Sequence, residues 1–230
     1  MDGHMFDDQI PAVPEDIGIC VWDARGHGRS SLEGAFDYED LVEDLRALID
    51  GLDALEVTLV GQSMGGNLAQ TYVERYPQDV DRIVLIGCSD NHGPLSRLER
   101  LAIASAGPTL AMTPWRWTVA QSARVCGKEQ STVEYARRAL ESIDKRRFVE
   151  VLDSLIEALR PDPEYRLPVP ALLLCGGEDV SGNIRTAMPR LAERNPCAEL
   201  VIIDGAAHNA NMDRPEATNR HLVAFLEENS

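Results

Sequence analysis

The sequence predicts an α/β fold, in which a mostly parallel sheet is covered by helices on both faces. Three observations predict it. Short runs rich in Val, Ile and Leu alternate with amphipathic stretches, as expected for buried parallel strands joined by helices. One of these runs leads directly into the glycine-flanked serine of GQSMGG. A long helix-forming stretch, residues 91–167, interrupts the alternation once.

Five apolar runs are predicted to be strands. Each is apolar along most of its length, so both faces of the strand would be buried, as in a parallel sheet. Strand and helix alternate, which indicates right-handed crossovers. The five runs are IGICVWDARG, with its strand at 18–23, EVTLVG at 56–61, DRIVLIGCS at 81–89, VPALLLCGG at 169–177 and AELVIIDG at 198–205.

Helical patterns lie between the predicted strands. The first predicted helix, between Asp37 and Gly51, has its apolar residues along one face. Asp37 is suited to cap its amino terminus, and Gly51 is suited to end it. A second helix follows the serine turn and is expected to end at Pro77. Two more helices are predicted at 185–194 and 214–228.

Residues 91–167 are predicted to form a helical cap over the carboxyl edge of the sheet. They contain helix-forming runs such as PLSRLERLAIASA and KRRFVEVLDSLIEALR, and no convincing strand. The sheet core would then consist of residues 1–90 and 168–230.

Composition narrows the class of protein. Hydrophobic residues make up 44% and charged residues 26% of the 230 residues, as in an ordinary globular protein. The formal net charge of −16 would repel phosphate backbones, so no nucleic-acid partner is expected. No apolar stretch is long enough to span a membrane, and the first residues lack the features of a signal peptide. A cytoplasmic protein without a membrane partner is therefore expected.

The cysteines argue against a disulfide framework. They are odd in number, widely spaced and mostly inside apolar runs, which favours reduced, buried thiols. Because no C-x-x-C pair is present, a structural zinc site is not expected, and neither a metal nor a cofactor is predicted. The five are Cys20, Cys88, Cys126, Cys175 and Cys197.

Polar residues at the carboxyl ends of the predicted strands are candidates for catalysis, because catalytic groups of open α/β sheets gather there. Ser63 follows the second strand, Asp179 the fourth and His208 the fifth. A serine hydroxyl needs an imidazole to accept its proton and a carboxylate to hold that imidazole in the right tautomer. The chain order serine, acid, histidine, with the serine in G-x-S-x-G, matches a described catalytic pattern.

The residues around Ser63 are expected to form a sharp strand-to-helix turn. Gly61 and Gly65 would remove side chains that collide there, and Gly66 would extend the clearance. The turn would aim the Met64 N–H and the helix amino terminus at a developing oxyanion. Ser63 could instead be a helix cap and nothing more, but the strand before it and the helix after it favour a nucleophile.

Other acids and histidines compete for two of these roles. Glu178 should point to the opposite side of the strand end from Asp179. Asp90 follows the third strand, from which an acid could also reach the histidine, so the choice between Asp179 and Asp90 stays open. The other histidines are His4 near the start, His27 in a GHG turn, His92 at the opening of the cap and His221 within the last helix.

These residues resemble the α/β-hydrolase superfamily, especially the capped serine hydrolases of small esters, enol-lactones and carbon–carbon bonds. The resemblance implies that Ser63 is the nucleophile, Asp179 the acid, His208 the base and the Met64 N–H one oxyanion donor. A serine argues against the dehalogenases and epoxide hydrolases of this fold, which use an aspartate. The matching stretches are VWDARGHGRSS, VTLVGQSMGGNLAQTYVERYPQDVDRIVLIG, LLLCGGEDV and IDGAAHNANMDRPEATNRHLVAFL.

The chain departs from this superfamily at its start. Members begin with further strands, the third of which ends in a His-Gly loop that supplies a second oxyanion N–H. That strand lies between those expected here at 18–23 and 56–60. MDGHMFDDQIPAV resembles the tail of that loop, so the chain is expected to be an amino-terminally truncated hydrolase whose sheet lacks its first strands. Ala207 stands where the family often has glycine.

Substrate choice would belong to the cap. Trp115 and Trp117 in MTPWRWT could form an aromatic wall for an apolar acyl group, or could pack the cap onto the sheet. Val180, after the acid, is another candidate lining residue. The sequence predicts a serine hydrolase of a small carboxylic ester or lactone. A non-catalytic ligand-binding relative is the alternative, which the missing oxyanion segment favours.

Overall fold

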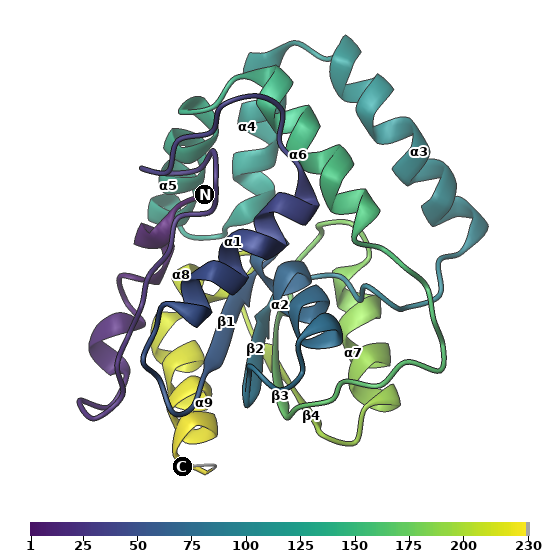
Figure 1. Ribbon diagram of the computed structural model, residues 1–230. Coiled ribbons are helices and arrows are strands. Elements are labelled where there is room, and N and C mark those ends of the chain that lie inside the picture. The colour runs from purple at the N-terminus through teal and green to yellow at the C-terminus, as the bar shows by residue number, and fades with distance from the viewer. Residues whose placement is uncertain (229–230) are drawn as a thin grey trace.

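The structure is a computed structural model that describes residues 1–228, and it contains one four-stranded parallel sheet (Figure 1). The strands stand in the order β1-β2-β3-β4, so neighbours in the sheet are also successive strands in the chain. They are β1 (Thr58–Gln62), β2 (Arg82–Ile86), β3 (Ala171–Gly176) and β4 (Ala198–Ile203).

Helices connect and surround these strands. None in the described part of the chain is long and apolar enough to cross a membrane. The helices are α1 (Tyr38–Asp50), α2 (Met64–Arg75), α3 (Arg97–Met112), α4 (Trp115–Cys126), α5 (Gln130–Glu141), α6 (Lys145–Glu157), α7 (Ile184–Arg194), α8 (Ala210–Asp213) and α9 (Pro215–Glu227). Two short 3-10 helices, η1 (Gly3–Phe6) and η2 (Ile10–Ala12), lie at the start.

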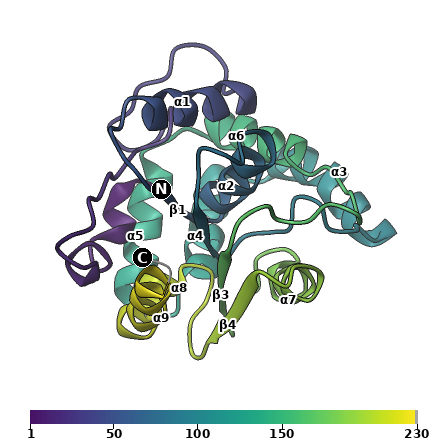
Figure 2. The same cartoon turned by 60° about the horizontal axis from the view of Figure 1, so that its bottom comes forward.

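Both faces of the sheet are covered, as the apolar strands predict. Ile83 and Leu85 of β2 belong to one core cluster, with residues of α1, α2 and α7. Val84 and Ile86 belong to a second cluster, with residues of α8 and α9. Because successive side chains of a strand point to opposite faces, a continuous apolar run fits a sheet with helices on both sides (Figure 2). The α/β fold class is confirmed.

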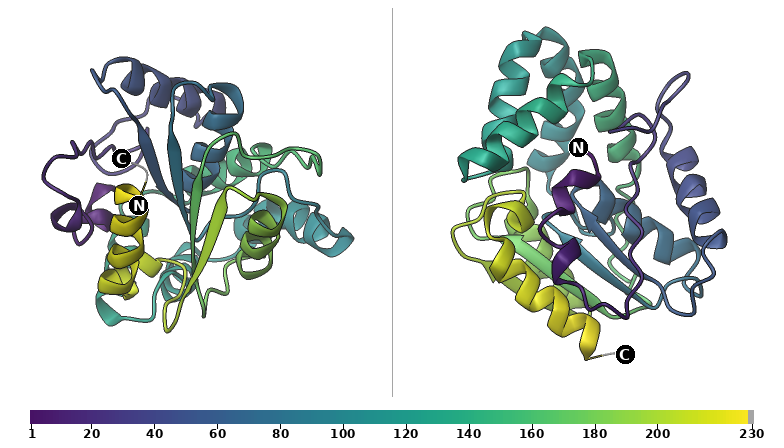
Figure 3. Two further views of the ribbon diagram at one scale, coloured as in Figure 1. Left: turned by 90° about the horizontal axis from the view of Figure 1, so that it is seen from below. Right: turned by 90° about the vertical axis from the view of Figure 1, so that its left-hand side faces the viewer.

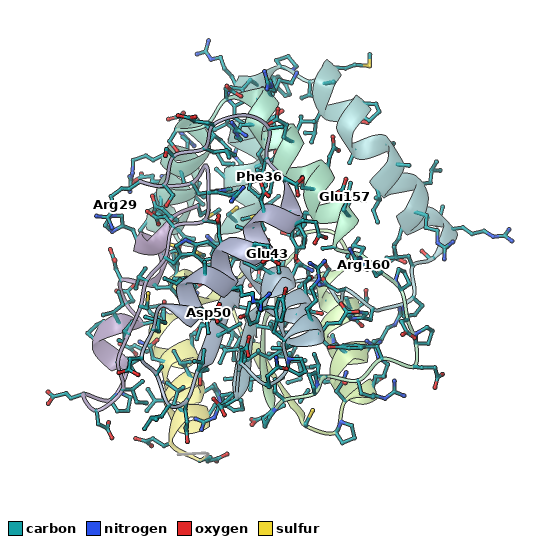
Figure 4. The ribbon with its side chains drawn as sticks, in the orientation of Figure 1. Arg29, Phe36, Glu43, Asp50, Glu157 and Arg160 are labelled. Carbon is teal, nitrogen blue, oxygen red and sulfur yellow. The ribbon has the colours of Figure 1, made fainter. Side chains whose placement is uncertain are left out.

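The expected helix ends are observed at the sheet domain. Asp37 caps α1 by accepting hydrogen bonds from the N–H groups of Glu39 and Asp40, and Gly51 follows its last residue. The outer side of α1 carries acidic residues such as Glu43 and Asp50 (Figure 4). Its inner side is buried in the first core cluster. This helix thus lies on the sheet as a simple amphipathic element.

The strand predicted at 18–23 is wrong. These residues form no ladder, and β1 pairs only with β2 within the described residues. Figure 3 shows the segment as irregular chain that runs past the sheet. Ile19 and Val21 are 47% and 43% exposed, although Trp22 packs against the first core cluster. An apolar run becomes a strand only where another strand satisfies its N–H and C=O groups, and within residues 1–228 no strand pairs with this run.

The regular secondary structure within residues 91–167 is helical and consists of α3 to α6 (Figure 1). Their two ends meet, because the N–H of Arg160 donates to the carbonyl of Asn91 at 2.7 Å. The helices α4 and α5 form an apolar cluster of their own, against which Trp115 and Phe148 pack. This segment therefore has a small core distinct from the two clusters that flank the sheet.

Candidate active site

Ser63 occupies a sharp turn between β1 and α2. Its φ and ψ are 51° and −114°, and it is the one non-glycine residue with positive φ in the described chain. Such a conformation is strained for a residue with a side chain. The Ser63 side chain makes no capping hydrogen bond to α2. A simple helix cap therefore does not account for this serine.

At two of the three glycines near Ser63, the turn leaves no space for a side chain. A Cβ on Gly61 would lie 2.2 Å from the carbonyl oxygen of Gly65, and one on Gly66 would lie 2.7 Å from the sulfur of Cys88. A Cβ on Gly65 would meet nothing within 4 Å. The expectation that Gly65 is needed for clearance is therefore wrong, because its Cβ position faces open space.

The tertiary fold brings Ser63, His208 and Asp179 into one chain of contacts. Nε2 of His208 lies 3.0 Å from Oγ of Ser63, and Nδ1 lies 2.9 Å from Oδ2 of Asp179. His208 is 8% and Asp179 2% exposed. The three residues follow β1, β3 and β4, whose carboxyl ends meet at one edge of the sheet. Hydroxyl, imidazole and carboxylate thus have the geometry for proton transfer from the serine.

The competing acids have other partners. Asp90 is 4% exposed and accepts a hydrogen bond from Arg194 at 3.0 Å. Glu178 points to Lys128, 2.5 Å away, and this ammonium holds the pKa of Glu178 below its usual value. His208 has Asp179 as its carboxylate neighbour. The geometry therefore places Asp179 beside His208 and Asp90 beside Arg194.

The remaining histidines lie in other surroundings. His92 is buried and stacks on Tyr165, with ring centroids 3.8 Å apart. His27 is buried in its turn and faces the carbonyl of Arg25. His4 is exposed beside Asp7, and His221 lies within α9.

A further polar residue, Gln62, holds the histidine loop, residues 205–209, and is not among the site residues that the sequence predicts. Its side-chain amide donates to the carbonyl of His208 at 3.2 Å and to Oδ1 of Asn209 at 3.1 Å. Gln62 is the last residue of β1 and directly precedes Ser63. Its position next to Ser63 in the motif was the one feature of the sequence that could have pointed to Gln62. The partners of its amide group could not be predicted, because they depend on where the loop after β4 lies relative to the end of β1.

The residues predicted to contact the substrate have different surroundings. Met64 opens α2, at the end of the helix where backbone N–H groups lack partners within the helix. Trp115 packs against Phe148 of α6, with ring centroids 5.4 Å apart. Trp117 is 68% exposed, so in this structure its indole neither packs the cap onto the sheet nor lines an enclosed wall. Val180 is 66% exposed, at a shallow hollow of about 240 Å³ that Asp179 also lines.

Within residues 1–228, no group of three or more His, Cys, Asp or Glu side chains is arranged to hold a metal ion.

Known proteins resemble this chain over most of its length. The model of a family described as serine aminopeptidase, S33, matches residues 13–215. An sn-1-specific diacylglycerol lipase of Danio rerio is 26% identical over 223 residues, which are 91% of this chain and 69% of the lipase. The 3-oxoadipate enol-lactonase 2 of Acinetobacter baylyi is 24% identical over 227 residues, 96% of this chain and 83% of the lactonase.

The fold is also similar to solved structures. A thermophilic esterase from Thermogutta terrifontis superimposes with a TM-score of 0.80 at 21% sequence identity. The alignment covers 99% of this chain and 86% of the esterase. At this level of identity, the likeness concerns the fold.

Proposed function

The chain belongs to the serine aminopeptidase S33 family of α/β-hydrolases, and on that premise we propose that it cleaves a small carboxylic ester or lactone through an acyl-enzyme intermediate. One observation carries the proposal: a strained serine without a capping role whose hydroxyl lies 3.0 Å from a buried imidazole that in turn contacts a buried carboxylate. Relatives named as a lipase and an enol-lactonase support this substrate class.

In the proposed mechanism, Oγ of Ser63 attacks the substrate carbonyl carbon while Nε2 of His208 accepts its proton. Asp179 holds Nδ1 protonated and stabilises the imidazolium that forms. The imidazolium then donates its proton to the leaving alkoxide, which leaves an ester between the substrate acyl group and Ser63. A water molecule, deprotonated by the same imidazole, attacks this ester, and the carboxylic acid departs as Ser63 regains its proton.

The amino terminus of α2 would stabilise the negative charge that forms on the carbonyl oxygen. The N–H of Met64 is the proposed donor, since it directly follows the nucleophile and opens the helix. The partial positive charge at a helix amino terminus adds to this stabilisation. The strained conformation of Ser63 is consistent with a residue held for reaction.

Residues 91–167 are proposed to act as the cap that selects the substrate. The turn between α4 and α5 contacts the loops that carry His208 and Asp179: Asn209 donates to Cys126, and Lys128 pairs with Glu178. A helical segment anchored at this edge is suited to cover a bound acyl group. The core would comprise 1–90 and 168–230.

The test is labelling with a fluorophosphonate probe, combined with turnover of p-nitrophenyl esters of graded acyl length. The wild-type protein should be labelled on Ser63, and Ser63→Ala should lose both labelling and turnover. Ser105→Ala, at an exposed serine of α3, is the matched control and should keep both. Labelling that survives in Ser63→Ala would refute the assignment of the nucleophile.

Two further assays separate the alternatives. An aminoacyl p-nitroanilide compared with the matching p-nitrophenyl ester distinguishes a peptidase from an esterase. A protein that binds esters or lactones in a thermal-shift assay, but is neither labelled nor active, would be the ligand-binding relative instead.

A further inference from the structure

Asp213, the last residue of α8, holds two distant segments together through a buried carboxylate. It is 3% exposed. Oδ2 accepts a hydrogen bond from the N–H of Ala207 at 2.8 Å, and Oδ1 accepts one from the N–H of Glu129 at 3.0 Å. The N–H of Lys128 lies 2.9 Å from both oxygens. Three backbone N–H groups, those of Ala207, Lys128 and Glu129, converge on this one buried side chain, so this contact is more than incidental packing.

The two segments are the histidine loop, residues 205–209, and the α4–α5 turn, residues 126–129. A second bond joins them directly, because the N–H of Asn209 donates to the carbonyl of Cys126 at 2.7 Å. The residues on both sides of His208 are thus linked to the α4–α5 turn. Ala207 is linked through the side chain of Asp213, and Asn209 is bonded to the turn directly. Figure 2 shows α8 beside α4 and α5.

The approach of the turn to Asp213 is close. A Cβ on Gly127 would lie 3.1 Å from Oδ1 of Asp213 and 2.4 Å from Cγ2 of Thr132. With any larger residue at position 127, the α4–α5 turn could not lie this close to the carboxylate of Asp213.

Two exposed ion pairs lie around this contact and add little to it. Lys128 pairs with Glu178, with side chains 48% and 50% exposed, and Arg214 pairs with Glu129, with side chains 39% and 49% exposed. Ion pairs at such exposed positions contribute little because water screens them. The buried carboxylate of Asp213 is therefore the principal link between the turn and the histidine loop.

We infer that Asp213 is a positioning residue, which fixes His208 relative to Ser63 by tying the histidine loop to the α4–α5 turn. The inference rests on the proposed function. Asp213 reaches the histidine loop through the backbone N–H of Ala207, so its effect on His208 would pass through the backbone at that residue. A displacement of about 1 Å in a catalytic group can cost about 100-fold in rate, and the 3.0 Å contact between Nε2 and Oγ has little tolerance for it.

The first test is Asp213→Asn. An amide keeps the size of the side chain but presents an NH₂ group to at least one of the backbone N–H groups that the carboxylate satisfied. We expect kcat for a p-nitrophenyl ester to fall about 10- to 100-fold with little change in KM. Asp37→Asn is the matched control, since Asp37 accepts backbone N–H groups at the start of α1, away from the histidine loop and outside the proposed cap. It should keep the wild-type kcat.

The second readout does not depend on turnover. The proton shared by Nδ1 of His208 and Asp179 gives a far-downfield NMR resonance when that hydrogen bond is ordered. We expect this resonance to broaden or move upfield in Asp213→Asn at temperatures well below its melting point, and to persist in Asp37→Asn. If Asp213→Asn only melts earlier, and keeps both kcat and the resonance while folded, then Asp213 has a structural role alone and the inference is wrong.

A second pair of variants covers the case in which Asp213→Asn does not fold. Glu129 has φ −75°, which proline can adopt. Glu129→Pro removes one N–H donor to Asp213 together with the side chain, whereas Glu129→Ala removes the side chain and keeps the N–H. A lower kcat and a perturbed resonance in Glu129→Pro relative to Glu129→Ala support the inference, and equal values overturn it.

These outcomes are distinguishable from failure of the proposed function. If the wild-type protein turns over no ester, the proposed function fails, and the NMR resonance in the same variants still decides whether Asp213 positions His208. If the wild-type protein is active and Asp213→Asn equals it in both readouts, only the inference about Asp213 fails.

Discussion

Nδ1 of His208 lies 2.9 Å from a carboxylate oxygen of Asp179, whereas Asp90, at the end of the neighbouring strand β2, pairs with Arg194. Both carboxylates are almost fully buried. Their partners differ, and so should the consequences of their removal. One carboxylate is available to orient an imidazole, and the other neutralises a largely buried guanidinium.

Asp179→Asn should therefore be an activity variant. An amide at this position favours the wrong imidazole tautomer, and we expect kcat for a p-nitrophenyl ester to fall about 10⁴-fold. Steady-state kinetics on the purified variant, with its melting temperature measured in parallel, checks this expectation. A kcat within tenfold of wild type would remove Asp179 from the proposed mechanism.

Asp90→Asn should instead be a stability variant. Removing one partner of a buried ion pair leaves the other charge uncompensated and costs about 3–5 kcal/mol. Urea unfolding should show this loss of free energy of unfolding, while the kcat of the folded fraction should stay near wild type. The opposite ranking of the two variants would transfer the orienting role to Asp90.

Gly61 and Gly65, the glycines of G-x-S-x-G, should differ sharply in the substitutions that they tolerate. In Gly61→Ala the new Cβ would lie 2.2 Å from a backbone oxygen, which no side-chain rotation can relieve, and we expect a loss of about 3 kcal/mol. In Gly65→Ala the Cβ enters open space in the first turn of α2. Since alanine favours helix over glycine by up to about 1 kcal/mol, this variant should be as stable as wild type or more so. Urea unfolding of both measures the difference, and equal losses would contradict the geometry of the turn.

The five thiols should react in two classes. Cys20 and Cys197 are exposed, whereas Cys88, Cys126 and Cys175 are buried. Burial also raises the pKa of Cys126 to about 12 and that of Cys175 to about 11, which keeps these thiols protonated and unreactive. Titration with a chromogenic disulfide should show two fast thiols in the native protein and five after denaturation.

Cys20 makes that titration a test of the fold as well. It lies in the segment 18–23, which the sequence predicts as a buried strand and the structure leaves irregular and open. Cys20→Ser should remove one of the two fast thiols. If native Cys20 proved protected, the segment would be covered in solution.

His27 should make the protein less stable in mild acid. Burial above all, with a smaller effect of the amino-terminal charge, lowers the pKa of His27 from 6.5 to about 4. The unfolded chain therefore binds a proton below pH 6.5 that the folded protein does not bind until about pH 4. The free energy of unfolding should fall as the pH drops from 6.5 to 4, by at most about 3 kcal/mol from this residue.

The control for this effect is His27→Gln, which cannot take up the proton. Urea unfolding of both proteins at several pH values between 4 and 7 isolates the contribution of His27 from that of the carboxylates. Parallel pH dependences in the two proteins would show that His27 titrates alike in both states.

Much of the fold is predictable from local patterns. Four of the five apolar runs are strands, and the helices begin and end within a few residues of the expected positions, as at Asp37 and Gly51. The fifth run, at 18–23, shows the limit of this approach. Its composition is that of a strand, but its conformation depends on whether another strand lies beside it.

The candidate site shows the same division. The motif GQSMGG and the polar residues after later strands are visible in the sequence, because catalytic groups in open α/β sheets gather at the carboxyl ends of strands. The sequence does not show whether Asp179 or Asp90 contacts the histidine, since both residues follow strands that end at the same edge of the sheet. The exposure of Trp117 was likewise unpredictable, because it depends on how α4 packs against its neighbours.

The sequence by itself determined the parallel α/β architecture, the strained serine turn and the identity of the residues that could serve as nucleophile, acid and base. These features follow from the spacing of apolar residues, from the order of the polar residues along the chain and from the chemistry of serine, histidine and aspartate. All of these can be read from short stretches of sequence. Tertiary structure alone decided which carboxylate contacts His208, that β1 has a neighbour on one side only among the described residues, and that Gln62 and Asp213 bond to the backbone of residues 207–209. The physical reason is that these contacts join segments far apart in the chain, so a residue's own neighbours in sequence do not specify them.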